Sequence, residues 1–138
     1  MFSVKVFTIM IGSLSGTMEE VYVAKEVVRK WNQLNAESTR KLFMPVEWTG
    51  NPDELQKVDV VIGLVGNYID NQVFIEDCLK AGKKVTLFFN AYQDPKNTIQ
   101  SEHDEVNAFK RSVEANCCCI EYRGSTNLAQ LLVEKLWP

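Results

Sequence analysis

Five short apolar runs alternate with amphipathic segments along this 138-residue chain, and this alternation is what most limits the folds available to it. The runs are rich in β-branched and aromatic residues, which indicates strands. They lie at residues 4–11, 42–48, 58–65, 84–90 and 117–122. Strands that alternate with helices pair in parallel, because a helical crossover returns the chain to the same end of the sheet. The order of elements therefore predicts an α/β domain.

The segments between the runs show helical spacing. At residues 18–34, apolar side chains recur every third or fourth position and form one stripe. Further helices are expected at residues 52–57, 71–81, 101–115 and 126–136. Thr17 and Glu20 have the spacing of a capping box, and Gly82 is placed to end a helix. The first and third strands are the most apolar, so right-handed crossovers predict one domain, residues 1–138, with three α/β/α layers and strand order 2-1-3-4-5.

Charge and cysteine content restrict the expected partners. The formal net charge is −3, which argues against a nucleic-acid or anionic-membrane binder, and no apolar run approaches the roughly 20 residues of a membrane span. Three of the four cysteines are consecutive, at 117–119, where neighbours on a strand point to opposite faces. Neither a disulfide framework nor a metal site is expected, and the cytoplasm is the expected compartment. Small molecules or proteins are the expected partners.

The carboxyl ends of the first and third strands are the expected ligand site, because open α/β sheets bind ligands where the strand order reverses. The loop after the first strand offers glycines, hydroxyls and a helix N-terminus to a phosphate or carboxylate. Its expected ligand contacts are Gly12, Ser13, Ser15, Gly16 and Thr17. The loop has neither the lysine of a P-loop nor the GxGxxG spacing of a Rossmann turn. The alternative is a well-capped turn without a ligand.

The loop after the third strand leads into a helix that carries carboxylates. Its expected ligand contacts are Gly66, Asn67 and Tyr68. Helical geometry places Glu76 about 100° to one side of the expected buried stripe, where it can flank a cleft. A carboxylate beside a sugar ring can support cleavage of an N-glycosidic bond. Asp70 is the rival carboxylate. The alternative for Glu76 is a solvated surface residue without a catalytic role. His103, on the helix expected at residues 101–115, is likewise expected to be a solvated polar residue.

Six blocks of the chain resemble, in order and spacing, a TIR-like family of domains of unknown function. Members of that family often lie at the N-termini of bacterial signalling or conflict NTPases. The blocks lie at residues 28–35, 42–48, 59–63, 81–89, 106–110 and 121–123. The family is part of a wider flavodoxin-like set that includes TIR domains and nucleoside 2-deoxyribosyltransferases. The resemblance therefore implies a flavodoxin-like fold.

The resemblance also implies a function. In the enzymatic relatives a glutamate on the helix after the third strand performs the glycosidic chemistry, and Glu76 is its nearest equivalent here. The expectation is a bacterial signalling or defence domain that binds an NAD- or nucleoside-type ligand, and the finer expectation is that it cleaves that ligand. One alternative is a non-catalytic domain that self-associates or docks a signalling protein. A less favoured alternative is an FMN electron carrier, with phosphate at residues 12–17 and Tyr68 or Tyr92 stacked on the flavin.

Overall fold

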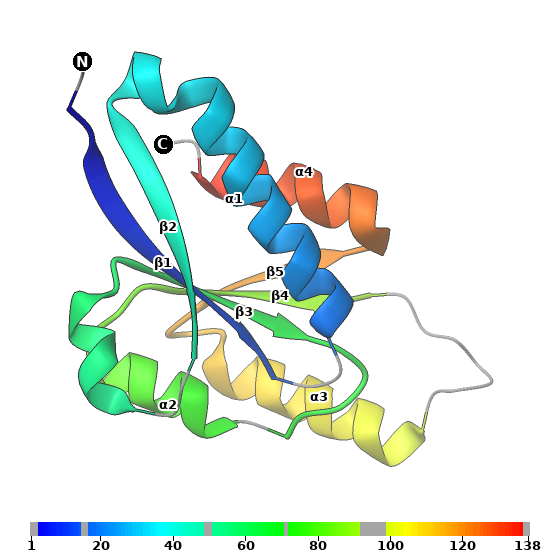
Figure 1. The fold of residues 1–138 in the computed structure, drawn as a ribbon. Helices are drawn as coiled ribbons and strands as arrows, with labels where there is room; N and C mark the ends of the chain where they lie inside the picture. Colours follow the sequence, from blue (N-terminus) through cyan, green and yellow to red (C-terminus); the bar gives the residue numbers. More distant parts are fainter. Residues whose placement is uncertain (1–2, 15–16, 49–50, 71, 92–98, 137–138) are drawn as a thin grey trace.

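The computed structural model describes residues 3–14, 17–48, 51–70, 72–91 and 99–136. Its five strands form one parallel sheet in the order β2-β1-β3-β4-β5 (Figure 1). The strands are β1 (Lys5–Ser13), β2 (Lys41–Glu47), β3 (Val60–Val65), β4 (Val85–Asn90) and β5 (Cys118–Tyr122). The helices are α1 (Met18–Thr39), the 3₁₀ helix η1 (Pro52–Lys57), α2 (Gln72–Lys80), α3 (Gln100–Val113) and α4 (Gly124–Leu136).

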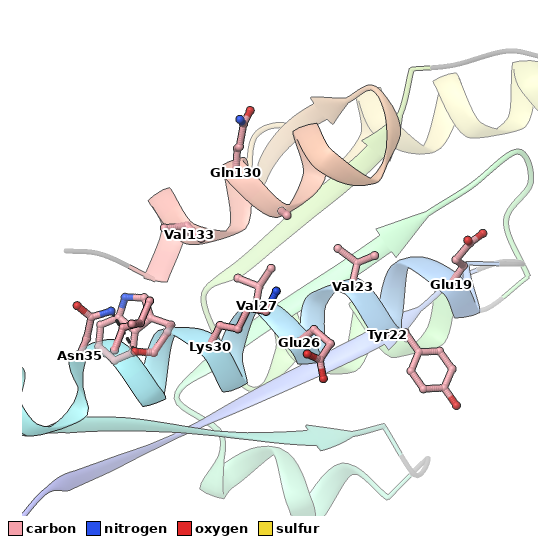
Figure 2. Close-up of a pocket in the computed structure, with 12 residues that line it drawn as sticks. Glu19, Tyr22, Val23, Glu26, Val27, Lys30, Asn35, Gln130 and Val133 are labelled. Carbon is pink, nitrogen blue, oxygen red and sulfur yellow. Dashed lines mark hydrogen bonds between the residues drawn. The ribbon is translucent and has the colours of Figure 1, made fainter.

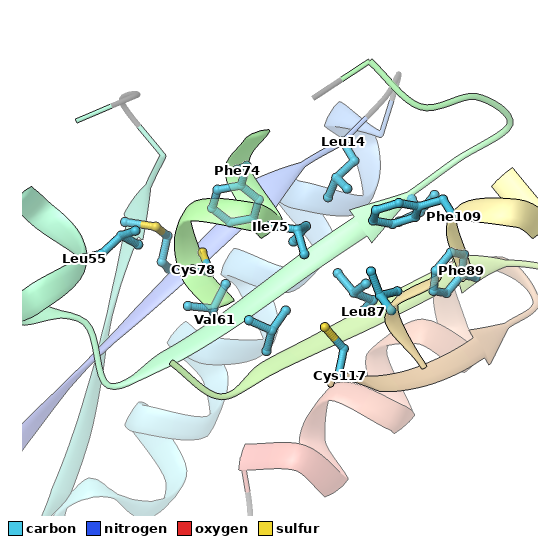
Figure 3. Close-up of a cluster of buried hydrophobic side chains, with 14 of the residues drawn as sticks. Leu14, Leu55, Val61, Phe74, Ile75, Cys78, Leu87, Phe89, Phe109 and Cys117 are labelled. Atoms are coloured by element: carbon cyan, nitrogen blue, oxygen red, sulfur yellow. The ribbon is translucent and has the colours of Figure 1, made fainter. Parts of the chain in front are cut away.

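The helices cover the sheet on both faces. Helices α1 and α4 lie side by side on one face, and α2 and α3 lie on the other (Figure 1). Each interface has its own buried apolar cluster, and alternate residues of β1 supply them: Ile9 and Ile11 point to the α1 side, Met10 to the α2 side. Figure 3 shows the α2 side. The α/β/α fold class and the strand order predicted from the sequence are confirmed.

The first helix is longer than the predicted span of residues 18–34. It continues to Thr39, and Ala36, within this added segment, is buried. Two side chains of this extension add hydrogen bonds to carbonyls one turn earlier: the Asn35 amide donates to Trp31 O at 3.0 Å, and the Thr39 hydroxyl donates to Asn35 O at 2.6 Å. The helix ends at Arg40, which adopts a left-handed conformation with φ of 59°.

The first strand is less covered than its apolar sequence predicts. β3 pairs with β1 from Ile9 onward, so the earlier residues of β1 pair with β2 alone. Lys5 and Val6 are consequently exposed, whereas residues 9–12 are buried. Among the described residues, no helix combines the length and the apolar character that crossing a membrane requires.

All four cysteines are free thiols, and the strand separates the consecutive three. Cys117 is buried, Cys118 is exposed and Cys119 lies between these extremes. Cys78, on α2, has no exposed surface. Burial raises the pKa of Cys78 to about 12 and that of Cys117 to about 11, because an apolar interior disfavours the thiolate.

These buried thiols predict a loss of stability in alkaline solution. The unfolded chain releases the Cys78 proton near the ordinary thiol pKa of about 8.5, whereas the folded chain holds it until about 12. The thiol's contribution is therefore complete below the unfolded pKa and is lost as pH rises toward the folded pKa. Urea unfolding above neutral pH should show the free energy of unfolding falling less steeply for Cys78→Ala than for wild type. The exposed-site control Cys118→Ala should keep the wild-type slope, and equal slopes for all three proteins would contradict the prediction.

Candidate functional site

The loop after β1 is closed onto β3 by its own hydrogen bonds. The Leu14 amide donates to Leu64 O at 2.9 Å, and the buried Thr17 hydroxyl donates to the same carbonyl at 3.2 Å. The hydroxyls of Ser13 and Thr17 lie 2.5 Å apart. The predicted capping box is wrong, because Thr17 makes no side-chain cap of α1 and uses its hydroxyl to hold the loop against the sheet. Ser15 and Gly16 lie outside the described residues.

Gly12 lies beneath an aromatic ring at the end of β1. A Cβ atom at this position would come within 2.7 Å of Cε1 of Phe74, which reaches over from α2. Trp48 packs on that ring, with centroids 5.1 Å apart. The lack of a side chain at Gly12 thus admits Phe74 on this face of the sheet. Gly12 and Ser13 also line a 190 Å³ hollow together with Glu47 and Trp48.

Only some of the ligand contacts predicted after β3 line a hollow in the described part of the chain. Gly66 and Asn67 line one at the carboxyl edge of the sheet. Tyr68 is 38% exposed, and the alternative flavin-stacking residue, Tyr92, lies outside the described residues. The two candidate carboxylates are not enclosed, and neither Glu76 nor Asp70 lines any of the five hollows described for the placed part of the chain. The backbone amide of Asp70 donates to Leu14 O at 2.9 Å, which ties this loop to the first one.

A polar hollow of 170 Å³ opens at the carboxyl ends of β3, β4 and β5, on the α3 side of the sheet. Lys110 from α3 pairs with Glu121 from β5 at 2.7 Å. The hydrogen bond from Lys110 lowers the pKa of Glu121, and the charge of Arg123 lowers it further. His103 shares a 3.1 Å hydrogen bond with the side chain of Asn107. Cationic and amide groups thus gather in this hollow.

A second hollow, of 360 Å³, lies at the same edge beside the start of α4. It is lined by Glu20, Asn90, Tyr122, Arg123, Gly124 and Ser125. Burial raises the pKa of the Tyr122 phenol well above its usual value, and the neighbouring Glu20 carboxylate raises it further. The phenol is therefore neutral at physiological pH and can donate a hydrogen bond. Asn90 and Arg123 line both hollows, so the two meet at the ends of β4 and β5.

This pair of hollows was not predicted from the sequence, although the sequence places two polar residues where they could have indicated it. Asn90 ends the predicted fourth strand, and Arg123 directly follows the fifth. Parallel strands bring such positions to one edge, where α/β sheets bind ligands. His103, expected to be a solvated residue, is half-buried in the wall of the first hollow. Among the residues that the structure places, no three His, Cys, Asp or Glu side chains gather closely enough to hold a metal ion.

No protein-family model and no curated protein sequence matches this chain. Among solved structures, crystal structures of Staphylococcus aureus homoserine dehydrogenase at pH 7.0 and pH 6.0 each match with a TM-score of 0.51 and 12% identity over 86% of this chain. A homoserine dehydrogenase from Thiobacillus denitrificans matches with a TM-score of 0.46 and 15% identity. This chain spans about a third of the length of these enzymes: 33% and 32% for the two S. aureus chains and 30% for the third. At this identity the S. aureus likeness shows a shared α/β fold.

Proposed function

We propose that this domain binds an NAD- or nucleoside-type ligand at the carboxyl edge of the sheet between β4 and β5. The observation that carries the proposal is the position of Arg123 and Asn90, which line both polar hollows at that edge. The fold class supports it, because open α/β sheets bind ligands beyond the carboxyl ends of their strands. The switch point between β1 and β3 is a weaker candidate, because the Thr17 hydroxyl is engaged with Leu64 and Phe74 covers Gly12.

The two hollows offer complementary chemistry to such a ligand. A guanidinium can bind a phosphate through two parallel hydrogen bonds, so Arg123 is the proposed phosphate contact. Its own backbone amide is already engaged, donating to Asn127 Oδ1 at 2.7 Å. The Glu20 carboxylate, which lines the 360 Å³ hollow, can accept from ribose hydroxyls. Asn90 lines both hollows, so it lies where it can contact either part of the ligand.

Cleavage of the N-glycosidic bond is the finer part of the proposal. Hydrolysis breaks the bond between C1′ and the base nitrogen, whose electron pair leaves with the base, while a water oxygen bonds to C1′ and gives up its proton. A carboxylate beside C1′ supports the positive charge that develops on the sugar. Glu76 remains the carboxylate predicted from the resemblance, with Asp70 as its rival. Glu20 is a third candidate, because it lines the 360 Å³ hollow and they do not.

The experiment is a titration of the protein with NAD, nucleotides and nucleosides, in which calorimetry measures binding. The melting temperature is a second readout, because a bound ligand stabilises the folded state by mass action. We expect at least one member of the panel to bind wild type, and Arg123→Ala to weaken its binding about tenfold or more, the loss of a charged hydrogen bond. Arg111→Ala is the matched control, since Arg111 is exposed on α3 and lines neither polar hollow. Binding that Arg123→Ala leaves intact, or no binding by any member, would refute the proposal.

The same incubations, analysed by chromatography for free base, test cleavage separately. Release by wild type that one of Glu20→Gln, Asp70→Asn or Glu76→Gln abolishes would assign the carboxylate. Ligand binding without base release would leave the binding function standing and defeat the catalytic assignment.

A further inference from the structure

Helices α1 and α4 leave an apolar groove of 610 Å³ between them, on the face of the sheet opposite α2 and α3 (Figure 2). Val23 and Val27 extend from α1 toward α4 within it (Figure 2). Its walls carry large apolar side chains that are well exposed: Tyr22 at 69%, Leu34 at 80% and Val133 at 44%. Exposed apolar side chains that gather in one groove mark an interaction site.

The outer wall of the groove is a single ridge of α1. Tyr22, Glu26, Lys30 and Leu34 follow one another at intervals of four residues and all line the groove. Residues at this spacing form a continuous row on a helix surface. The row reads apolar, acidic, basic, apolar. When two copies of this row lie antiparallel, Tyr22 of each faces Leu34 of the other, and Glu26 of each faces Lys30 of the other. The ridge is therefore complementary to a second copy of itself.

We propose that the groove binds a second copy of this chain, with the two α1 ridges running in opposite directions about a two-fold axis. Rows of every fourth residue pack into each other's grooves at a crossing angle of about −50°. Tyr22 of each copy then lies against Leu34 of the other, and Glu26 of each faces Lys30 of the other. Such an interface uses the same patch on both copies, as closed symmetric dimers do.

The charges at the middle of the ridge favour a second copy over a helix whose charges at the crossing all have the same sign. Glu26 is held by Arg29 of its own chain at 2.9 Å, and both side chains are exposed, so the carboxylate stays at the surface. A helix with only basic or only acidic residues at the crossing would meet one like charge there. A second copy presents the two charges in the reverse order and meets two opposite ones. Electrostatic complementarity of this kind sets the register of an interface.

The sharpest test reverses one charge in each of two variants and measures dimerisation of each variant alone and of their mixture. This design distinguishes pairing between the ridges from a general effect of net charge. Sedimentation equilibrium of the full chain should show a dimer that dissociates on dilution. Lys30→Glu alone and Glu26→Lys alone should each weaken dimerisation about tenfold, because both symmetric pairs become like-charged. An equimolar mixture of the two variants should dimerise more tightly than either, since the two acidic side chains of the first variant then face the two basic side chains of the second. Arg111→Glu on α3 carries the same charge change as Lys30→Glu and should dimerise as wild type.

A substitution at the apolar end of the ridge gives a second readout. Leu34→Ser removes a side chain that is 80% exposed, so it should keep the wild-type circular dichroism and melting curve while it weakens dimerisation. A wild-type chain that stays monomeric at every concentration would overturn the proposal. So would a dimer that Lys30→Glu and Leu34→Ser leave unchanged, or a mixture no tighter than its parts.

Discussion

Replacing Phe74 with alanine is expected to lower the free energy of unfolding by about 3–5 kcal/mol, the usual cost of removing a buried phenylalanine ring. Phe74 has no exposed surface and lies in the apolar cluster on the α2 side of the sheet (Figure 3). Its ring covers Gly12 and contacts Trp48, so it joins α2 to the ends of β1 and β2. The loss combines the transfer of the ring out of the core with the cavity that the ring leaves. Urea unfolding followed by circular dichroism measures it.

The neighbouring residue provides the matched control. Val73 is on the same helix but is 59% exposed, so Val73→Ala should change the free energy of unfolding by less than about 0.5 kcal/mol. A loss of stability of similar size for Val73→Ala and Phe74→Ala would contradict the assigned packing, because it would trace the effect to the helix and not to the ring.

Replacing Gly12 with alanine is the second large effect, a loss of about 1–3 kcal/mol from overpacking. The new Cβ would lie 2.7 Å from Cε1 and 2.8 Å from Cζ of Phe74, closer than packed carbon atoms approach. The ring is rigid and fully buried, so it can move away only by displacing the core around it. Thermal or urea unfolding of Gly12→Ala against wild type gives the size of the loss.

A double-mutant cycle identifies the cause. Phe74→Leu replaces the flat ring with a smaller, more adaptable side chain and should itself lose stability. Added to Phe74→Leu, Gly12→Ala should then cost less than it costs in wild type, which is a coupling between the two positions. Purely additive losses would contradict the assignment of the Gly12→Ala loss to a clash with the Phe74 ring.

Strand order, layers and most element positions could be read from the sequence, because they depend on local periodicity and on short-range connection rules. The run at residues 58–65 is apolar almost throughout, and the structure places β3 at the centre of the sheet. Gly82 follows its helix with a φ of 72°, as its spacing predicted. The separation of Cys117 from Cys118 also follows from the two-residue period of a strand. Each of these features is decided by residues close together in the chain.

The position of the proposed ligand site along the carboxyl edge of the sheet depends on tertiary contacts. Gly12, Ser13 and Thr17 form a plausible phosphate loop in isolation, but Leu64 and Phe74, distant in sequence, engage the Thr17 hydroxyl and cover the glycine. The set that gathers Glu20, Asn90 and Arg123 comes from α1, β4 and the residue after β5. The sequence by itself determined the sheet and the edge at which polar residues collect, since local hydrophobic patterns are sufficient for both. Only the tertiary structure decided which polar groups on that edge line open hollows, because the hydrogen bonds and packed rings there join segments that no local pattern relates.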